Sequence, residues 1–103
     1  MAESIKIRAT LQGDVADVRM LVNHPMETGQ RKNERGDLIP PHFITVLTAT
    51  HNGRTVMEAH WSQGVARNPP LGFRVRGAKV GDKISISWID NKGEKGSADA
   101  VVS

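Results

Sequence analysis

Hydrophobic and polar residues alternate with a period of two along most of the chain, a pattern that predicts β-strands. In residues 5–11 every second residue is aliphatic or alanine, and charged or hydroxyl side chains lie between them. The same kind of pattern predicts six further strands, at residues 16–22, 43–51, 54–62, 72–77, 83–90 and 94–102. No segment shows a helical period over ten residues. About seven antiparallel strands in a chain of this length indicate an all-β fold, an immunoglobulin-like β-sandwich.

Asn52-Gly53 predicts a tight hairpin between two of these strands, because both residues readily take the positive φ that a two-residue turn requires. A regular ladder from that turn places Ile44 opposite Trp61. One face of the hairpin is then apolar and is expected to point into the core: Ile44, Val46, Met57, Ala59 and Trp61. The other face is expected to be half solvated: Thr45, Leu47, Glu58 and His60.

The last predicted hairpin turns through Asn91-Lys92-Gly93, with the glycine in the left-handed position. This turn sets large residues against small ones across the two strands: Trp88 opposite Gly96, Ile86 opposite Ala98 and Ile84 opposite Ala100. A slip of one residue would put Trp88 against Lys95, so this register is well specified.

Residues 24–41 break the pattern, because they show neither a strand nor a helix period. Long irregular connections are uncommon in compact domains and are usually functional or disordered. Met26, Leu38 and Ile39 lie among the charges of this stretch. We therefore expect a loop that packs on something, and the first place to look for function.

Length and composition bound the possibilities. A chain of 103 residues is expected to form one domain, residues 1–103. It has no cysteine, which excludes a disulfide framework, a thiolate nucleophile, an iron–sulfur cluster and any cysteine-ligated metal site. The net charge is only +3 and aromatic residues are few, so single-stranded nucleic acid is not an expected partner. No apolar run is long enough to span a bilayer, and the N-terminus has no signal-peptide pattern.

The four histidines are the natural candidates for a metal site, but the predicted register separates them. His60 and His42 point to opposite faces, and His51 lies beside the hairpin turn. His24 approaches His42 only if the long loop closes on itself. No HxH or HExxH spacing is present. We therefore expect no metal ligands and no cofactor, and interpret these side chains as surface or turn histidines.

No catalytic motif emerges either. Ser62 lacks the glycine spacing of a nucleophile elbow, and the glycines form neither a GxGxxG motif nor a P-loop. The carboxylates of the long loop are interspersed with Arg31, Lys32 and Arg35, which is typical of a solvated loop. A sandwich without catalytic residues is most often a binding module, so we expect no enzyme activity.

Three separated stretches resemble the SoxZ family of bacterial thiosulfate-oxidising systems. They are His24-Pro25-Met26-Glu27-Thr28-Gly29-Gln30-Arg31-Lys32 with the following Leu38-Ile39-Pro40-Pro41-His42-Phe43-Ile44, then Trp61-Ser62-Gln63-Gly64-Val65-Ala66-Arg67-Asn68-Pro69, and finally Gly81-Asp82-Lys83 through Ser87-Trp88-Ile89-Asp90-Asn91-Lys92-Gly93-Glu94. The similarity runs nearly end to end, with small departures at Pro41 and Gln63.

This resemblance implies an immunoglobulin-like, non-catalytic subunit that pairs with SoxY in the SoxYZ sulfur carrier. In that family SoxY holds the substrate on a cysteine in a C-terminal glycine-rich arm, where other Sox enzymes act on it in turn. The absence of cysteine here fits such a division of labour, because a second thiol would compete for the intermediates. The resemblance further implies a periplasmic location, reached by export together with SoxY.

We expect seven residues of the long loop and its end to lie on or beside a partner surface: Met26, Glu27, Thr28, Arg31, Ile39, His42 and Phe43. In the competing interpretation, Met26 and Ile39 only cap the open end of the sandwich. Two alternative functions stay open: a stand-alone metal or redox protein, and a generic ligand-binding sandwich. Self-association of the isolated chain is a further possibility.

Overall fold

The computed structural model describes residues 5–62 and 70–103, which form seven β-strands. The strands are β1 (Ile5–Gln12), β2 (Val15–Val22), β3 (Ile44–His51), β4 (Arg54–His60), β5 (Pro70–Arg76), β6 (Lys83–Asp90) and β7 (Lys95–Val101). Their positions match the period-two stretches of the sequence to within a few residues. No helix long and apolar enough to cross a membrane occurs in the part of the chain that the structure describes.

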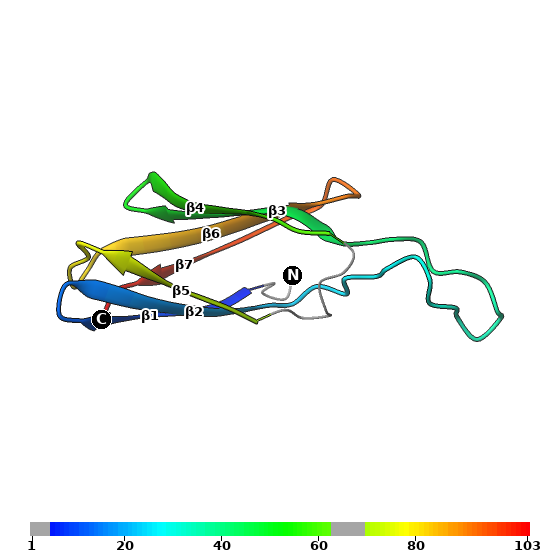
Figure 1. Cartoon of the computed structure of the whole chain (residues 1–103), viewed down its shortest axis with the longest axis horizontal. Coiled ribbons are helices and arrows are strands. Elements are labelled where there is room, and N and C mark those ends of the chain that lie inside the picture. Colours follow the sequence, from blue (N-terminus) through cyan, green and yellow to red (C-terminus); the bar gives the residue numbers. More distant parts are fainter. Residues whose placement is uncertain (1–4, 63–69) are drawn as a thin grey trace.

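The strands form two antiparallel sheets that face each other (Figure 1). One sheet has three strands in the order β1-β2-β5, and the other has four in the order β4-β3-β6-β7. The expected immunoglobulin-like β-sandwich is confirmed. On one side, β1 and β7 lie next to each other, and Ser103 exchanges backbone hydrogen bonds with Ala9 and Leu11. The C-terminus therefore pairs with the outer edge of β1.

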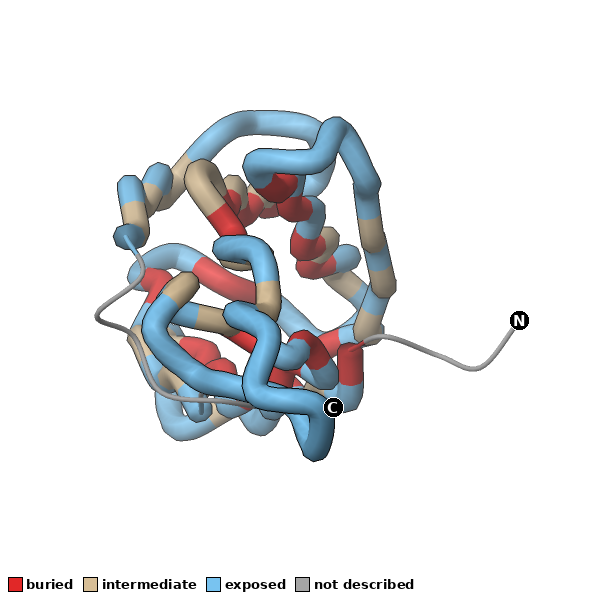
Figure 2. The backbone as a smooth tube through the Cα atoms, turned by 90° about the vertical axis from the view of Figure 1, so that its right-hand side faces the viewer, coloured by how far each residue is buried: buried red, intermediate tan, exposed pale blue. Residues whose placement is uncertain are grey.

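The buried residues form one hydrophobic core, to which both sheets contribute. Figure 2 marks the buried positions along the backbone. The largest side chains that are fully buried are aliphatic: Ile44, Leu47, Ile84, Ile86, Val18, Val22 and Val102. Full burial of each such side chain contributes roughly 1.5–3 kcal/mol to folding. Trp88 is buried as predicted, whereas Trp61 is half buried at the margin of the core.

The register predicted for the last hairpin is confirmed. Trp88 lies opposite Gly96, Ile86 opposite Ala98 and Ile84 opposite Ala100. Gly93 has a φ of 81° and takes the left-handed turn position. The pairing of bulky residues with small ones fills the inner face of β6 and β7 without crowding.

The register predicted for the Asn52-Gly53 hairpin is correct only beside the turn. His51 pairs with Arg54 and Thr50 with Thr55, but the next pair is Ala49 with Met57. Val56 is therefore an extra residue in β4, and this bulge shifts the remaining ladder by one. A second irregularity lies in the pairing of β3 with β6, where the register shifts between Ile44 and Val46.

These irregularities change which residues of β3 enter the core. Leu47 was expected on the half-solvated face and is completely buried. Val46 was expected in the core and instead lines the outer face of the sheet, half exposed. Ile44, Met57 and Ala59 face the core as predicted, and Trp61 donates its backbone N–H to Thr45 rather than lying opposite Ile44.

The irregular stretch forms a two-sided projection, residues 27–42, which we call the arm (Figure 1). Backbone bridges join Glu27 to His42 near its base and Lys32 to Leu38 near its tip. At the tip, the Asn33 side-chain oxygen accepts hydrogen bonds from the backbone N–H groups of Arg35 and Asp37. The arm extends the molecule to 53 Å along its longest axis, against 24 and 19 Å along the others.

Candidate functional site

The base of the arm is held by one buried carboxylate. Asp90, the last residue of β6, accepts at Oδ2 from His24 Nε2 at 3.0 Å and from His42 Nε2 at 2.7 Å. His24 follows β2 and His42 precedes β3, so the two histidines stand at the two ends of the irregular stretch. We call these three residues the clamp. It joins the arm to both sheets.

The hydrogen bonds fix the tautomer of His24. Its Nδ1 accepts the backbone N–H of Met26 at 3.0 Å, so the ring proton must be on Nε2, where it is donated to Asp90. The other oxygen of Asp90, Oδ1, accepts the backbone N–H groups of Lys92 and Glu94 in the β6–β7 turn. Four donors therefore surround this carboxylate.

The pKa of Asp90 reflects two opposed effects. Burial acts to raise the pKa, but the hydrogen bonds from His24, the Glu94 backbone, His42 and the Lys92 backbone together lower it below its ordinary value. The carboxylate is therefore ionised at neutral pH, and its charge is stabilised by the donors of the clamp.

Aromatic and sulfur contacts pack around the clamp. The ring of Trp88 meets His24 edge-on, with centroids 5.0 Å apart, and the two histidine rings lie 4.6 Å apart. Met26 is buried with a φ of 47°, and its Sδ accepts the backbone N–H of Ile44 at 3.4 Å. The indole N–H of Trp88 is buried with no hydrogen-bond acceptor in the described structure.

The expectation that the register keeps the histidines apart is wrong for His24 and His42. The arm closes on itself at its base, the one condition under which they could meet. His51 instead donates to Asp82 at 2.7 Å at the opposite end of β6, and His60 pairs with Glu58 on the surface. The positions of the two histidines in the sequence could have indicated the pair. Both flank the long loop, which lies at the end of the sandwich where β6 ends at Asp90.

Three possible metal ligands come together in the clamp, all within 4.8 Å of one another. Glu94 Oε2 lies 3.3 Å from His42 Nε2 and would complete a set of four. A metal on Nε2 of His24 would, however, move the ring proton to Nδ1, directly against the N–H of Met26. As arranged, the cluster fits a hydrogen-bonded clamp better than a metal centre.

The seven residues expected at a partner surface fall into two groups. Met26, His42 and Phe43 pack into the base of the arm, where they are buried or half buried. Thr28 and Arg31 are exposed and Glu27 and Ile39 partly so, on the arm itself. Arg31 forms a two-point ion pair with Glu27, which stiffens this part of the arm. Beside Ile39, Leu38 is 60% exposed, although it is not one of the seven expected residues.

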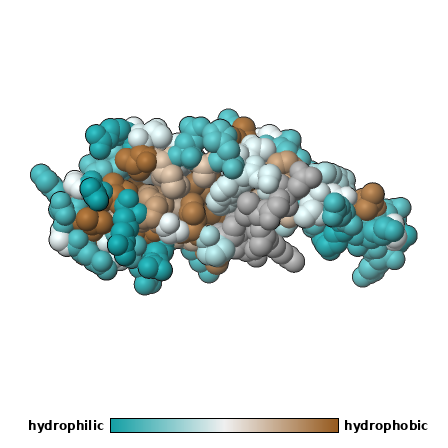
Figure 3. Space-filling view, viewed as in Figure 1, coloured by the Kyte–Doolittle hydropathy of each residue, from teal (hydrophilic) through white to brown (hydrophobic). Residues whose placement is uncertain are grey.

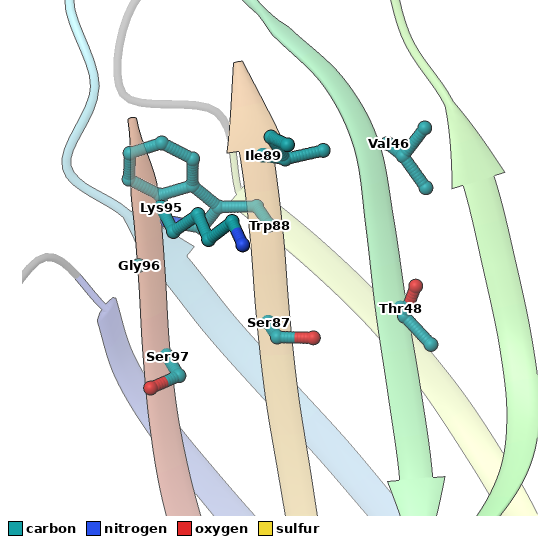
Figure 4. Close-up of a pocket in the computed structure, with 8 residues that line it drawn as sticks. All are labelled: Val46, Thr48, Ser87, Trp88, Ile89, Lys95, Gly96 and Ser97. Atoms are coloured by element: carbon teal, nitrogen blue, oxygen red, sulfur yellow. The ribbon is translucent and has the colours of Figure 1, made fainter. Parts of the chain in front are cut away.

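A shallow groove crosses the outer face of the four-stranded sheet (Figure 4). Its volume is about 550 Å³, and its lining consists of hydroxyl and aliphatic side chains of β3, β6 and β7 together with Trp88 and Lys95. Among the described residues that line the groove, Lys95 is the one ionisable residue, so they form no acid–base pair or nucleophile–base pair.

Residues 5–101 match the family model described as "Sulphur oxidation protein SoxZ". The chain belongs to the SoxZ family. It is therefore a subunit of a Sox sulfur-oxidation system. Two of the stretches that resemble SoxZ meet in the clamp, because one contributes His24 and His42 and another contributes Asp90. The remaining stretch lies mostly in residues 63–69, outside the described residues.

Among curated proteins, none matches this SoxZ-family chain. Among solved structures, superoxide reductase (neelaredoxin) from Ignicoccus hospitalis is similar, with a TM-score of 0.64 and 19% identity over 98% of this chain and 80% of that one. The reduced form of the Archaeoglobus fulgidus protein has a TM-score of 0.59 and 19% identity over 96% of this chain and 86% of that one. At this identity the likeness concerns the fold alone.

Proposed function

We propose that this chain is the non-catalytic subunit of a SoxYZ carrier in bacterial thiosulfate oxidation, paired with SoxY in a heterodimer. Membership of the SoxZ family supports the pathway, and the projecting arm supports a role in association. The arm is fixed at its base by a buried carboxylate, and near its tip it carries the exposed Leu38 beside the partly exposed Ile39. Such an arm is suited to contact another protein.

In this proposal SoxY, and not this chain, binds the sulfur intermediates covalently. This chain has no thiol, so the sulfur intermediates are held on a cysteine of SoxY. The present subunit supports that cysteine-bearing segment and helps present it to the other Sox enzymes, which bind transiently. We place the complex in the periplasm, with SoxY carrying the export signal for both.

The structure refines which arm residues we propose for the interface. Met26 is only 4% exposed, so it supports the arm from beneath, as the capping interpretation requires. Ile39 is half exposed and Leu38 lies open beside it. We therefore propose that Thr28, Arg31, Leu38 and Ile39 touch SoxY, while Glu27, His42 and Phe43 hold them in place.

Co-expression with the protein encoded beside this chain tests the proposal. We expect that neighbour to end in a cysteine-bearing glycine arm and to co-purify with this chain in a one-to-one complex. A neighbour of this kind that does not associate with the chain at micromolar concentration would contradict the proposal.

A further inference from the structure

The outer face of the three-stranded sheet is unusually basic. In β1, β2 and β5 the apolar residues alternate inward, and the residues between them point away from the core. Five of these outward residues are cations, a set that we call the basic face: Lys6, Arg8, Arg19, Arg74 and Arg76. Asp17 is the single acid among the outward residues of the three strands.

The register forces like charges together. Arg8 lies directly opposite Arg19 in the β1–β2 ladder, an arrangement that destabilises a sheet. Asp17 is bonded to Arg19 at 3.3 Å and lies opposite Arg74. Within the described part of the chain, the other four cations of the basic face have no ion pair and no side-chain hydrogen bond.

The surface between these cations is open to a partner. Gly72 lies beside Arg19 in the ladder and places no side chain there. A shallow depression of about 320 Å³ is lined by Lys6, Arg8, Arg19 and Leu21, and Leu21 is 42% exposed. Figure 3 shows strongly hydrophilic side chains gathered along the end of the sandwich away from the arm, on the side of this sheet. Guanidinium groups in such a position can each bind a carboxylate in a two-point contact.

We propose that the basic face docks the acidic surface of a protein partner, separately from the arm. The cations are spread over roughly 20 Å along the strands and about 10 Å across them, given 3.3 Å per residue and 4.8 Å per strand. A patch of this size fits a small, transient interface, in which charge mainly raises the association rate. The inference goes beyond the pairing with SoxY, and its failure would leave that pairing intact.

A protein fits this face better than a nucleic acid. No aromatic side chain points outward from β1, β2 or β5 to stack on a base. Asp17 lies within the patch, where it would repel a phosphate backbone but can accept from a donor on a protein surface. Leu21 adds an aliphatic contact at the margin.

The test uses the intact chain and fluorescent poly-L-glutamate as an acidic polypeptide probe, titrated at low ionic strength. The variant Arg8→Gln/Arg19→Gln/Arg74→Gln removes three charges from the basic face. The control Lys83→Gln/Lys92→Gln/Lys95→Gln removes the same number from the opposite sheet and the β6–β7 turn. We expect about tenfold weaker binding or more for the first variant, and a change within about twofold for the control.

Three results would overturn the proposal. One is an equal loss in both variants, which would indicate a response to net charge only. Another is the absence of probe binding at low salt. The third is tighter binding of a single-stranded oligonucleotide than of poly-L-glutamate at the same salt concentration. The single change Arg8→Glu adds an independent check: it should raise the melting temperature, because it replaces a like-charge pair with an opposite one, and yet weaken probe binding.

Discussion

His42 Nε2 lies 2.7 Å from Asp90 Oδ2, although 48 residues separate the two along the chain. Through this contact and the matching one from His24, the end of β6 holds both ends of the irregular stretch that contains the arm. The same relationship recurs at the start of β6, where Asp82 accepts from His51 at the end of β3. Histidine–aspartate pairs thus fasten β3 to β6 at both ends of the sandwich.

The clamp should contribute strongly to stability. Replacing Asp90 with Asn keeps the shape of the side chain but places a neutral amide where four hydrogen-bond donors meet. We expect the free energy of unfolding to fall by about 2–4 kcal/mol. Chemical denaturation measures this. Hydrogen exchange at the backbone of the arm should also become faster. Asp99→Asn, at an exposed site, is the control, and an equally small effect of both changes would contradict the role of the clamp.

The tautomer of His24 predicts that the clamp does not take up a metal. We expect the purified chain to hold no stoichiometric ion, and added Zn²⁺ to bind no more tightly to the wild type than to a His24→Gln variant. Metal analysis and calorimetry measure these quantities. One ion per chain, lost in the His24 variant, would refute the tautomer argument and revive the interpretation as a metal protein.

Asp82 predicts a specific dependence of stability on pH. Hydrogen bonds from His51, the Lys79 backbone and Asn52 lower its pKa from 3.8 to about 2. A carboxylate with a lowered pKa stabilises the fold above its unfolded pKa, and that contribution disappears as pH falls toward the folded value. Between pH 4 and about 2, Asp82→Asn should therefore lose less stability than the wild type does. Parallel unfolding curves of the two proteins across this window would contradict the assignment.

The bulge in β4 predicts opposite outcomes for two neighbouring residues. Leu47 is fully buried, so Leu47→Ala should cost about 2–5 kcal/mol. Val46 lies on the outer face, so Val46→Ala should cost about 1 kcal/mol or less. Thermal or urea unfolding compares them. The regular register expected from the turn alone would reverse this order.

The sequence predicts the last hairpin well and the first only in part, for a physical reason. Gly96, Ala98 and Ala100 leave room for large partners in one register only, so the pattern determines the pairing. Around Val56 no glycine or charge marks the extra residue, and both faces of β3 carry apolar side chains. A register shifted by one residue therefore fits the sequence pattern as well as the regular register does.

The clamp was beyond prediction from local patterns. It depends on the closure of the arm at its base. This closure brings His24 and His42, 18 positions apart, to Asp90 on β6. Met26, expected on or beside a partner surface, lies in the core with 4% of its surface exposed. Leu38, which is not among the expected residues, is 60% exposed, and only the path of the arm reveals this.

The affinity of the chain for the proposed SoxY partner, measured with and without the aliphatic side chains of Leu38 and Ile39, tests the central claim most directly. Leu38→Asp/Ile39→Asp should weaken the complex about tenfold or more and leave the melting temperature of the isolated chain nearly unchanged. The matched control Val80→Asp/Val101→Asp changes two exposed valines away from the arm and should leave the affinity unchanged. Equal affinities for the arm variant and the wild type would contradict the account.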